Sequence, residues 1–286
     1  MTLFGIVRIL ALMAVLAVMG VTAWAVWKVR GEVFEPKQTD EQLAALLAEK
    51  EVAPEIDPGE RVFNRAAELI ALGRVEEGRE KLLYVVNFHP DSPVAPEAKR
   101  ILGEMNLDDL LSTENMEGKS VCTVKPGDSF LGIAARYQTT LDCLMLLNGL
   151  TGFDRLHPGD KLVVMPLNFR VVIDPNRRVL TLWDKGRFLK EYRLLVCDPG
   201  RLARGAKTKI KGKTGILGDK RVPPSAKDYR GSEKVLSLGA GGLSIRAMPE
   251  DGSASGAGFR VSRPDMEELA LLLRVGNEVE IRPVSR

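Results

Sequence analysis

The chain contains few cysteines and histidines. Its 286 residues include three cysteines and two histidines. Three cysteines are too few for a disulfide-stapled fold, and His89 and His157 alone do not make a protein-only zinc site. The sequence therefore predicts no metal and no cofactor. Residues 168–286 contain no histidine and a single cysteine, Cys197, which restricts the nucleophilic chemistry open to that region.

The net charge of +3 is also low, but it combines an acidic region and a basic region. Residues 39–118 carry 18 acidic and 8 basic side chains, a net charge of −10, whereas residues 168–286 carry 24 basic and 14 acidic ones, a net charge of +10. A basic module can bind nucleic acid, yet no helix-turn-helix, zinc-finger or RNA-binding aromatic pattern accompanies it. We expect no nucleic-acid partner and favour an anionic cell-wall polymer.

A long apolar run lies near the N-terminus. Residues Ile9–Trp27, about 19 in number, carry no charge and are enough to cross a bilayer. We predict an uncleaved single-pass anchor, with residues 1–37 forming the anchor and its linker. The alternative is a cleaved signal peptide with a small-residue site at Ala23–Ala25. Either way the chain after about residue 30 lies outside the inner (cytoplasmic) membrane, on the periplasmic or cell-wall side.

Helical periodicity dominates residues 38–112. It predicts four helices, at 39–50, Arg61–Leu72, Val75–Phe88 and Pro96–Met105. The spacing resembles a single tetratricopeptide repeat, at Leu69, Leu72, Gly73, Gly78, Leu82 and Pro90. Such repeats bury their faces against neighbours, so the segment is either a helical spacer that holds a binding module off the membrane or a scaffold that recruits another envelope protein.

Residues 119–167 predict a β-α-α-β module. A strand at Cys122–Val124 leads through the turn Lys125–Asp128 into a helix that Asp128 or Ser129 caps. Thr140 caps a second helix, and Lys161–Met165 is the closing strand. Cys122 and Cys143 lie in this module, either as a disulfide or as two buried thiols.

The motifs of this module resemble those of LysM domains. They are Thr123–Ser129, Ile133-Ala134 with Tyr137, Asn148-Gly149-Leu150, and Leu156 with Pro158-Gly159-Asp160 and Leu162. The resemblance implies binding of glycan that contains N-acetylglucosamine, usually peptidoglycan in bacteria, in a shallow groove between the loops Gly127–Leu131 and Asn148–Phe153. The candidate glycan-binding residues are Gly127, Asp128, Ser129, Phe130, Leu131, Asn148, Gly149, Leu150 and Thr151. The alternative is that Gly127, Asp128 and Asn148 serve only turns and caps.

From Phe169 the apolar period changes to two, which is typical of strands. We expect strands at Phe169–Ile173, Val179–Trp183, Phe188–Val196, Val235–Leu238, Leu243–Ala247 and Glu278–Arg282, with one helix at Pro264–Leu273. Residues 168–286 thus predict a β-rich sandwich or barrel. Within it, Arg201–Lys213 carries six cations in thirteen residues. This stretch is a solvated, mobile loop, a contact for the acidic helical half, or an anion-binding patch that includes Lys207, Lys209 and Lys211.

This region is similar to the catalytic domain of L,D-transpeptidases, enzymes that cross-link the cell wall. The similarity rests on Val172-Ile173-Asp174 with Arg178 to Gly186, on Lys213-Thr214-Gly215, and on Arg260 to Ile281. Active members carry the motif S-H-G-C-(I/V)-R, whose cysteine is the nucleophile and whose histidine is the base. The matching stretch is Ser255–Arg260, where Gly258 holds the cysteine position and Gly256 the histidine position.

The upstream His-Gly element of that family is also replaced, here by Arg246-Ala247. Acyl transfer by a thiol needs a thiolate and a nearby base, so we predict no enzymatic activity. Cys197 is interpreted as a buried core thiol far from the motif. Arg246 and Arg260 are candidates for holding a carboxylate. An active transpeptidase with an unorthodox nucleophile, Ser253 or Ser255 beside Lys234 or Arg246, is the alternative.

Together these patterns predict an α+β multidomain protein: an N-terminal transmembrane helix, an α-helical segment like a tetratricopeptide repeat, a β-α-α-β LysM module and a β-rich C-terminal domain. The expected function is membrane-anchored binding of peptidoglycan, with a catalytically inactive L,D-transpeptidase-like domain.

Overall fold

The computed structural model describes residues 18–28, 57–152, 156–252 and 256–285. The chain divides into two units, Met1–Asp57 and Pro58–Arg286. In the first, residues 18–28 are helical and exposed. None of the helices in the described ranges is long and apolar enough to cross a membrane. Residues 9–17 of the predicted anchor, and the helix predicted at 39–50, lie outside the described residues.

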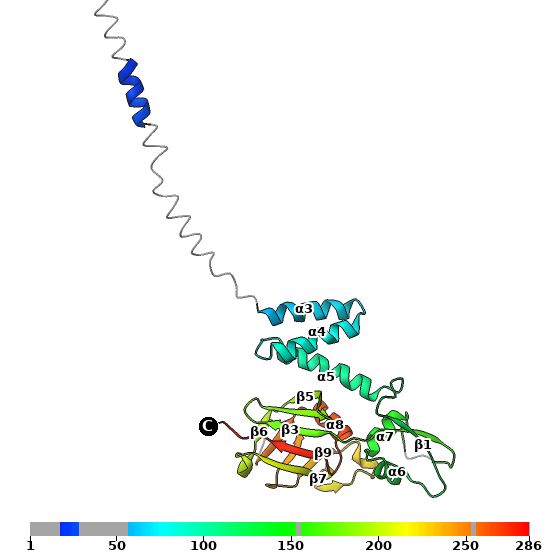
Figure 1. Cartoon of the computed structure of the whole chain (residues 1–286). Coiled ribbons are helices and arrows are strands. Elements are labelled where there is room, and N and C mark those ends of the chain that lie inside the picture. Colours follow the sequence, from blue (N-terminus) through cyan, green and yellow to red (C-terminus); the bar gives the residue numbers. More distant parts are fainter. Residues whose placement is uncertain (1–17, 29–56, 153–155, 253–255, 286) are drawn as a thin grey trace, which may run out of the picture. The chain divides into compact units, whose positions relative to one another are not determined.

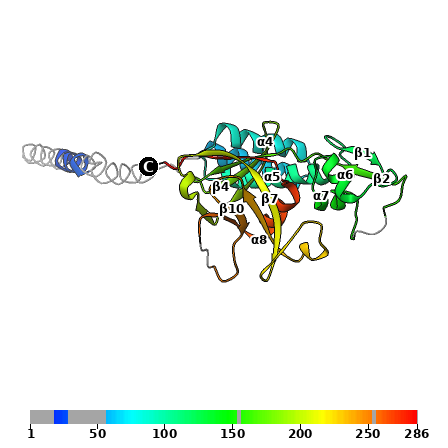
Figure 2. The same cartoon turned by 90° about the horizontal axis from the view of Figure 1, so that it is seen from below.

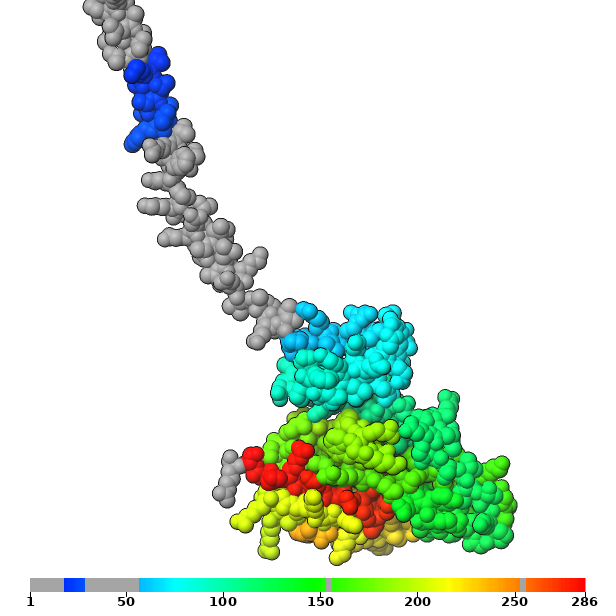
Figure 3. Space-filling model, viewed as in Figure 1, coloured from blue at the N-terminus to red at the C-terminus, as the bar shows by residue number. Residues whose placement is uncertain are grey.

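Three helices open the second unit (Figure 1): α3 (Pro58–Ala71), α4 (Val75–Phe88) and α5 (Ala95–Leu111). The turn between α3 and α4 uses Gly73 at φ +78°, a left-handed conformation that suits glycine. Gly78 lets the two helices approach closely, because a Cβ there would lie 2.5 Å from the Ile70 side chain. The helices share one small core, made of Ala66, Leu82, Val85, Ala95, Ala98 and Leu102. In the space-filling view the α3–α4 pair, in cyan, projects from the rest of this unit (Figure 3).

The last helix of the segment, α5, extends beyond its predicted end at Met105 because its final turns pack on the C-terminal domain. Leu107 belongs to that domain's core, and Leu110 and Leu111 pack against it. Asn106 Nδ2 donates to the carbonyl oxygens of Phe188 (3.1 Å) and Leu189 (3.0 Å). The helical segment is therefore in direct contact with the C-terminal domain.

The next module has the predicted β-α-α-β order. Strands β1 (Ser120–Thr123) and β2 (Lys161–Val164) pair antiparallel, with α6 (Phe130–Arg136) and α7 (Leu141–Leu147) between them in sequence. Ser129 and Thr140 cap the two helices: their hydroxyls accept hydrogen bonds from Gly132 N (3.1 Å) and Cys143 N (3.0 Å). Cys122 and Cys143 are both buried free thiols, so the disulfide alternative is wrong.

The C-terminal domain is built on a ten-stranded sheet, in the order β5-β4-β3-β12-β7-β9-β10-β11-β6 with β8 paired to β7. Its strands are β3 (Arg170–Asp174), β4 (Val179–Asp184), β5 (Arg187–Arg193), β6 (Val196–Asp198), β7 (Ala206–Leu217), β8 (Lys220–Val222), β9 (Glu233–Leu238), β10 (Ser244–Ala247), β11 (Gly258–Val261) and β12 (Glu278–Ile281). One helix of this domain, α8 (Arg263–Leu272), packs on β9 and β10. Strand β7 joins the part of the sheet that contains β12 to the part that contains β9, since its first residues pair with β12 and the rest with β9.

The prediction of a mobile loop at Arg201–Lys213 is wrong, because most of it belongs to β7. Lys207 lies opposite Glu280 and Lys209 opposite Glu278 in the antiparallel pair with β12. Opposite charges at such positions attract each other across the strands. Two of the three lysines predicted to bind anions, Lys207 and Lys209, therefore lie opposite carboxylates.

Two further expectations for this domain are corrected. The strand predicted at Phe188–Val196 is two strands, because the chain leaves β4 after Arg193 and Leu195 N donates to the carbonyl oxygen of Arg260 (2.8 Å). This turn carries Cys197 onto β6, where it lies opposite Phe259 of β11, next to Gly258. Cys197 is thus close to the motif and only half-buried, not a distant core thiol.

The LysM-like module and the C-terminal domain share a packed boundary (Figure 2). Cys143 and Leu147 of α7 belong to the main core cluster of the C-terminal domain. Thr140 Oγ1 donates to the carbonyl oxygen of Leu271 (2.7 Å). Lys213 Nζ lies 3.3 Å from Asp142 and also donates to the carbonyl oxygen of Ala270. Helix α7 is consequently fixed against α8.

Candidate functional site

A hollow of about 210 Å³ lies on the β-α-α-β module, at the end of α7. Its lining residues are Phe130, Gly149, Leu150, Thr151, Gly152, Leu156, Asp160 and Leu162. Apolar side chains and exposed backbone at a glycine-rich loop form a shallow surface of the kind that sugar rings can stack on. The hollow therefore lies at the predicted glycan loop that follows α7, and from the other predicted loop, Gly127–Leu131, it takes Phe130.

Four of the nine candidate glycan-binding residues line this hollow: Phe130, Gly149, Leu150 and Thr151. Phe130 and Leu150 are half-buried and also pack against the module's core. Gly149 has φ +61°, which sets the direction of the loop that follows α7. Thr151 is exposed, so its hydroxyl is accessible to a ligand.

Three other candidates have structural hydrogen bonds. Asn148 Nδ2 donates to the carbonyl oxygens of Leu144 (2.7 Å) and Val163 (2.8 Å), while its Oδ1 accepts from Val163 N (2.7 Å). Asp128 accepts from Lys125 N (2.9 Å) and forms an ion pair with Arg136. The hydrogen bond from Arg136, and then the one from Lys125 N, lower the pKa of the Asp128 carboxyl. Ser129 is the helix cap described above.

The remaining two candidates lie outside the lining. Gly127 has φ +85° in the turn before α6, and Leu131 is 51% exposed. Gly152, Leu156, Asp160 and Leu162 complete the hollow, although none of them was among the nine candidates. Gly152 lies in the predicted loop Asn148–Phe153, and the other three belong to a motif that carries the LysM resemblance.

In the C-terminal domain, the stretch compared with the L,D-transpeptidase motif ends in β11, which begins at Gly258. Gly258 adopts φ +143°, and a Cβ on it would lie 2.9 Å from the carbonyl oxygen of Ser244. A side chain at this position would therefore require a shift of the neighbouring strand β10. Ser253 and Ser255 lie outside the described residues. Lys234 Nζ is engaged by the carbonyl oxygens of Arg230 (2.9 Å) and Ser232 (2.9 Å).

Arg246 and Arg260 lie side by side, in register on the parallel strands β10 and β11. Arg246 Nε donates to Ser244 Oγ (3.1 Å). Arg260 is 9% exposed, and its Nη1 has no hydrogen-bond partner among the described residues. Burial, and then the charge of Arg246, lower the pKa of Arg260. The two guanidinium groups form a positively charged pair beside Gly258.

Thiol chemistry is unfavourable at both cysteines near the C-terminal domain. Burial raises the pKa of Cys197 to about 11 and that of Cys143 to about 11. A thiolate is the reactive species, so both thiols are neutral near pH 7. Within the described ranges, no three His, Cys, Asp or Glu side chains are grouped so that they could hold a metal ion.

The family model for the LysM domain matches residues 122–164, so this part of the chain is a LysM domain. An N-acetylmuramoyl-L-alanine amidase of Staphylococcus saprophyticus is 53% identical over 45 residues, which are 16% of this chain and 14% of that protein. The match thus spans about one seventh of the length of this curated relative.

Solved structures similar to the chain include L,D-transpeptidases. The one from Mycobacterium smegmatis is 14% identical, with a TM-score of 0.31 over 43% of this chain and 63% of that chain. The one from Stackebrandtia nassauensis is 17% identical, with a TM-score of 0.31 over 51% of this chain and 68% of that chain.

Proposed function

We propose that the protein is anchored in the inner membrane and binds peptidoglycan through its LysM domain, while its C-terminal domain is an L,D-transpeptidase-like domain without catalytic activity. The observation that carries the glycan proposal is the hollow formed by Phe130, Leu150 and Thr151 within the stretch that the LysM family model matches. LysM domains bind peptidoglycan, and the relative with the matching stretch is an amidase of N-acetylmuramoyl-L-alanine.

A pull-down on purified sacculi tests glycan binding. Thr151 is exposed and lines the hollow, so Thr151→Trp fills the site with little effect on the core. We expect the full chain to sediment with sacculi and the variant to bind at least tenfold more weakly. Thr113→Trp, an equal change at another exposed threonine, is the matched control and retains binding. A wild-type chain that stays in the supernatant would refute the proposal.

Three observations support the absence of catalysis. Gly256 and Gly258 occupy the positions of base and nucleophile, and residues 168–286 contain no histidine. A Cβ at Gly258 has no room beside Ser244. The half-buried Cys197 is a poor nucleophile because burial raises its pKa to about 11. Loss of a nucleophile commonly costs about a million-fold in kcat. Intact-mass analysis after incubation with a carbapenem checks this: we expect no acyl adduct, and an adduct on any residue would restore the enzymatic alternative.

Membrane anchorage rests on the uncharged run Ile9–Trp27 and the helix at residues 18–28. Fractionation tests it, since an anchored chain stays in the membrane pellet after alkaline carbonate extraction. Mass spectrometry of the mature N-terminus separates the two interpretations: a chain that starts near Ala25 has lost a signal peptide, and one that retains residues 1–25 has kept an anchor.

A second function, recruitment of an envelope protein, is favoured by exposed aromatic side chains on α4. Tyr84 and Phe88 stack with ring centroids 4.7 Å apart, although they are 45% and 67% exposed. Adjacent exposed aromatic rings are typical of protein-binding surfaces. Deleting the helical segment is unsuitable as a test, because Leu107 belongs to the C-terminal core. We expect Tyr84→Ser with Phe88→Ser to abolish co-purification of a specific envelope protein while sacculus binding is unchanged.

A further inference from the structure

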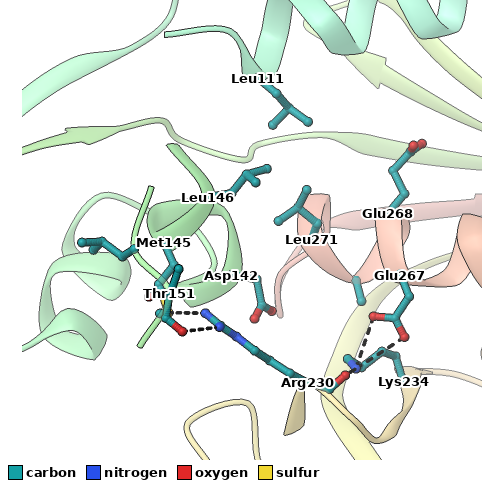
Figure 4. A pocket seen from close by; sticks show the side chains of 12 residues that line it. Leu111, Asp142, Met145, Leu146, Thr151, Arg230, Lys234, Glu267, Glu268 and Leu271 are labelled. Atoms are coloured by element: carbon teal, nitrogen blue, oxygen red, sulfur yellow. Dashed lines mark hydrogen bonds and ion pairs between the residues drawn. The ribbon is translucent and has the colours of Figure 1, made fainter. Parts of the chain in front are cut away.

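A second, larger cavity of about 510 Å³ lies between the LysM domain and the C-terminal domain. Figure 4 shows its walls, which come from the end of α5, from α7 and the loop after it, from Arg230 and Lys234, and from α8. The volume falls within the range of about 300–1,000 Å³ typical of small-molecule sites. Apart from Leu150 and Thr151, the residues that line this cavity have no part in the proposed glycan-binding function.

The cavity adjoins the glycan hollow directly. Leu150 and Thr151 line both. Arg230, from the C-terminal domain, reaches across to this loop: its Nη1 donates to the carbonyl oxygen of Thr151 at 2.7 Å, and its Nη2 lies 3.2 Å from Met145 Sδ. A molecule seated in the hollow can therefore continue past Thr151 into the cavity.

The walls of the cavity are held in place before any ligand binds. The hydrogen bond from Thr140 to Leu271 and the ion pair between Lys213 and Asp142 join α7 to α8. Lys213 is almost completely buried at this boundary. A pre-formed site loses little conformational entropy on binding. The cavity is therefore suited to binding a ligand.

The lining combines an apolar floor with charges of both signs. Leu111, Leu146 and Leu271 supply the apolar surface. The carboxylates of Asp142, Glu267 and Glu268 line one part, and the Glu267 side chain is 51% exposed even though it lies 3.3 Å from Lys234 Nζ. Arg230, whose side-chain hydrogen bonds go to a carbonyl oxygen and a sulfur, supplies an exposed positive charge.

We propose that this cavity binds the peptide branch of a wall glycan whose sugar lies in the adjoining hollow. The inference rests on the proposed glycan-binding function. A peptide branch is attached to the sugar, so it leaves the hollow beside the ring that it is bonded to. It also carries the two charges that match the lining: a free amine faces Glu267, and a carboxylate faces Arg230. Its short aliphatic side chains fit the leucine floor.

Binding assays on the full chain with three probes test this. The first is a peptidoglycan glycan strand with its peptide branches, the second is the same strand after amidase removal of the peptides, and the third is the branched strand with its peptide amines acetylated. We expect the branched strand to bind about tenfold more tightly than the other two, since one hydrogen-bonded charge pair contributes about that much.

Two substitutions assign the effect to the cavity. Glu267→Gln keeps the shape of the side chain and removes its charge. It should lower affinity for the branched strand about tenfold, leave the peptide-free strand unchanged, and have no further effect once the amines are acetylated. Glu250→Gln is the matched control, because Glu250 is also in an ion pair, 2.7 Å from Arg263, but lies outside the cavity. Leu146→Trp, at an exposed position, should block the cavity and reproduce the loss.

The outcomes separate this inference from the function beneath it. Equal binding of the branched and peptide-free strands, or a Glu267→Gln effect of the same size on both, overturns the peptide-branch site and leaves glycan binding standing. If Leu146→Trp alters self-association in analytical ultracentrifugation but not strand discrimination, the cavity is a contact between copies and the inference is wrong. If no strand binds at all, the proposed glycan-binding function fails first, and this inference fails with it.

Discussion

The carbonyl oxygen of Ser244 lies 2.9 Å from the point that a Cβ on Gly258 would occupy. Atoms at that separation clash, and the φ of +143° at Gly258 is itself strained for any residue with a Cβ. Glycine at position 258 is therefore a structural requirement of this sheet, where β11 lies against β10.

The first prediction concerns Gly258→Cys, which introduces a thiol at the position where the L,D-transpeptidase motif has its cysteine. We expect the variant to lose about 1–3 kcal/mol of unfolding free energy because of the backbone strain and the clash with Ser244. We also expect no acylation, since no histidine is present after residue 167 to activate the thiol. Thermal unfolding and intact-mass analysis with a carbapenem measure the two effects. A variant of native stability that forms the adduct would show that the site is intact.

The second prediction concerns the buried ion pair at the boundary of the two domains. The Lys213 side chain is 6% exposed, and its Nζ lies 3.3 Å from Asp142, near Tyr229, Cys143 and Lys234. Burial lowers the pKa of the Lys213 ammonium below its ordinary 10.5. Between that lowered pKa and about 10.5, the unfolded chain binds more protons than the folded one, so this group makes unfolding free energy rise with pH.

Lys213→Met removes this titration. The stability of the wild type relative to the variant should therefore increase as the pH is raised toward 10.5, as measured by urea unfolding at several pH values. At neutral pH the variant should lose about 3 kcal/mol, because Asp142 then lacks its partner in a largely buried site. Lys211→Met, on the same strand but exposed, is the control. A stability difference that is constant or shrinks with pH contradicts the assignment.

Sequence reasoning predicted the elements whose signals are local. Ser129 and Thr140 cap the helices of the LysM domain as expected, because a capping side chain and its amide are only three residues apart. Half of the glycan hollow followed from the same motifs.

Features that depend on pairing between distant residues were not predictable in this way. The lysine-rich stretch became β7 because Glu278 and Glu280, far along the chain, pair with Lys209 and Lys207. Cys197 lies opposite Phe259 because the chain leaves β4 after Arg193 and pairs with β11 instead. No local sequence pattern indicates this change of partner strand. The packing of α7 against α8, which brings Asp142 close to Lys213, likewise depends on residues far apart in the sequence. The sequence motifs therefore include residues that line the hollow on the LysM domain, but they do not predict the cavity beside it.

The third prediction concerns Asn106, which joins the helical segment to the C-terminal sheet. The register of β4 and β5 shifts beside Leu189, and Asn106 Nδ2 donates to the carbonyl oxygens of Phe188 and Leu189 at this irregularity. Its Oδ1 accepts from Arg79 Nη1 at 2.9 Å. A bulge leaves backbone groups without hydrogen-bond partners in the sheet. Asn106 provides the missing donor for two such carbonyl oxygens.

Asn106→Ala should lower unfolding free energy by about 1–3 kcal/mol, the cost of unpaired buried polar groups. Chemical denaturation measures it, and hydrogen exchange should show faster exchange in β5. Asn87→Ala, at an exposed position on α4, changes stability little. If both variants are equally stable, the irregular strand does not depend on α5.

The last prediction separates structure from binding at Asn148. This residue joins α7 to β2 by three hydrogen bonds, to Leu144 O and to both backbone groups of Val163. Asn148→Ala leaves these groups unpaired and should lower the stability of the LysM domain by about 2–3 kcal/mol. Because the side chain is absent from the lining of the glycan hollow, affinity for sacculi should match that of the wild type at temperatures where the variant is folded. Sedimentation and thermal unfolding, measured on the same samples, decide between the two roles. Native stability with lost sacculus binding would make Asn148 a glycan ligand instead.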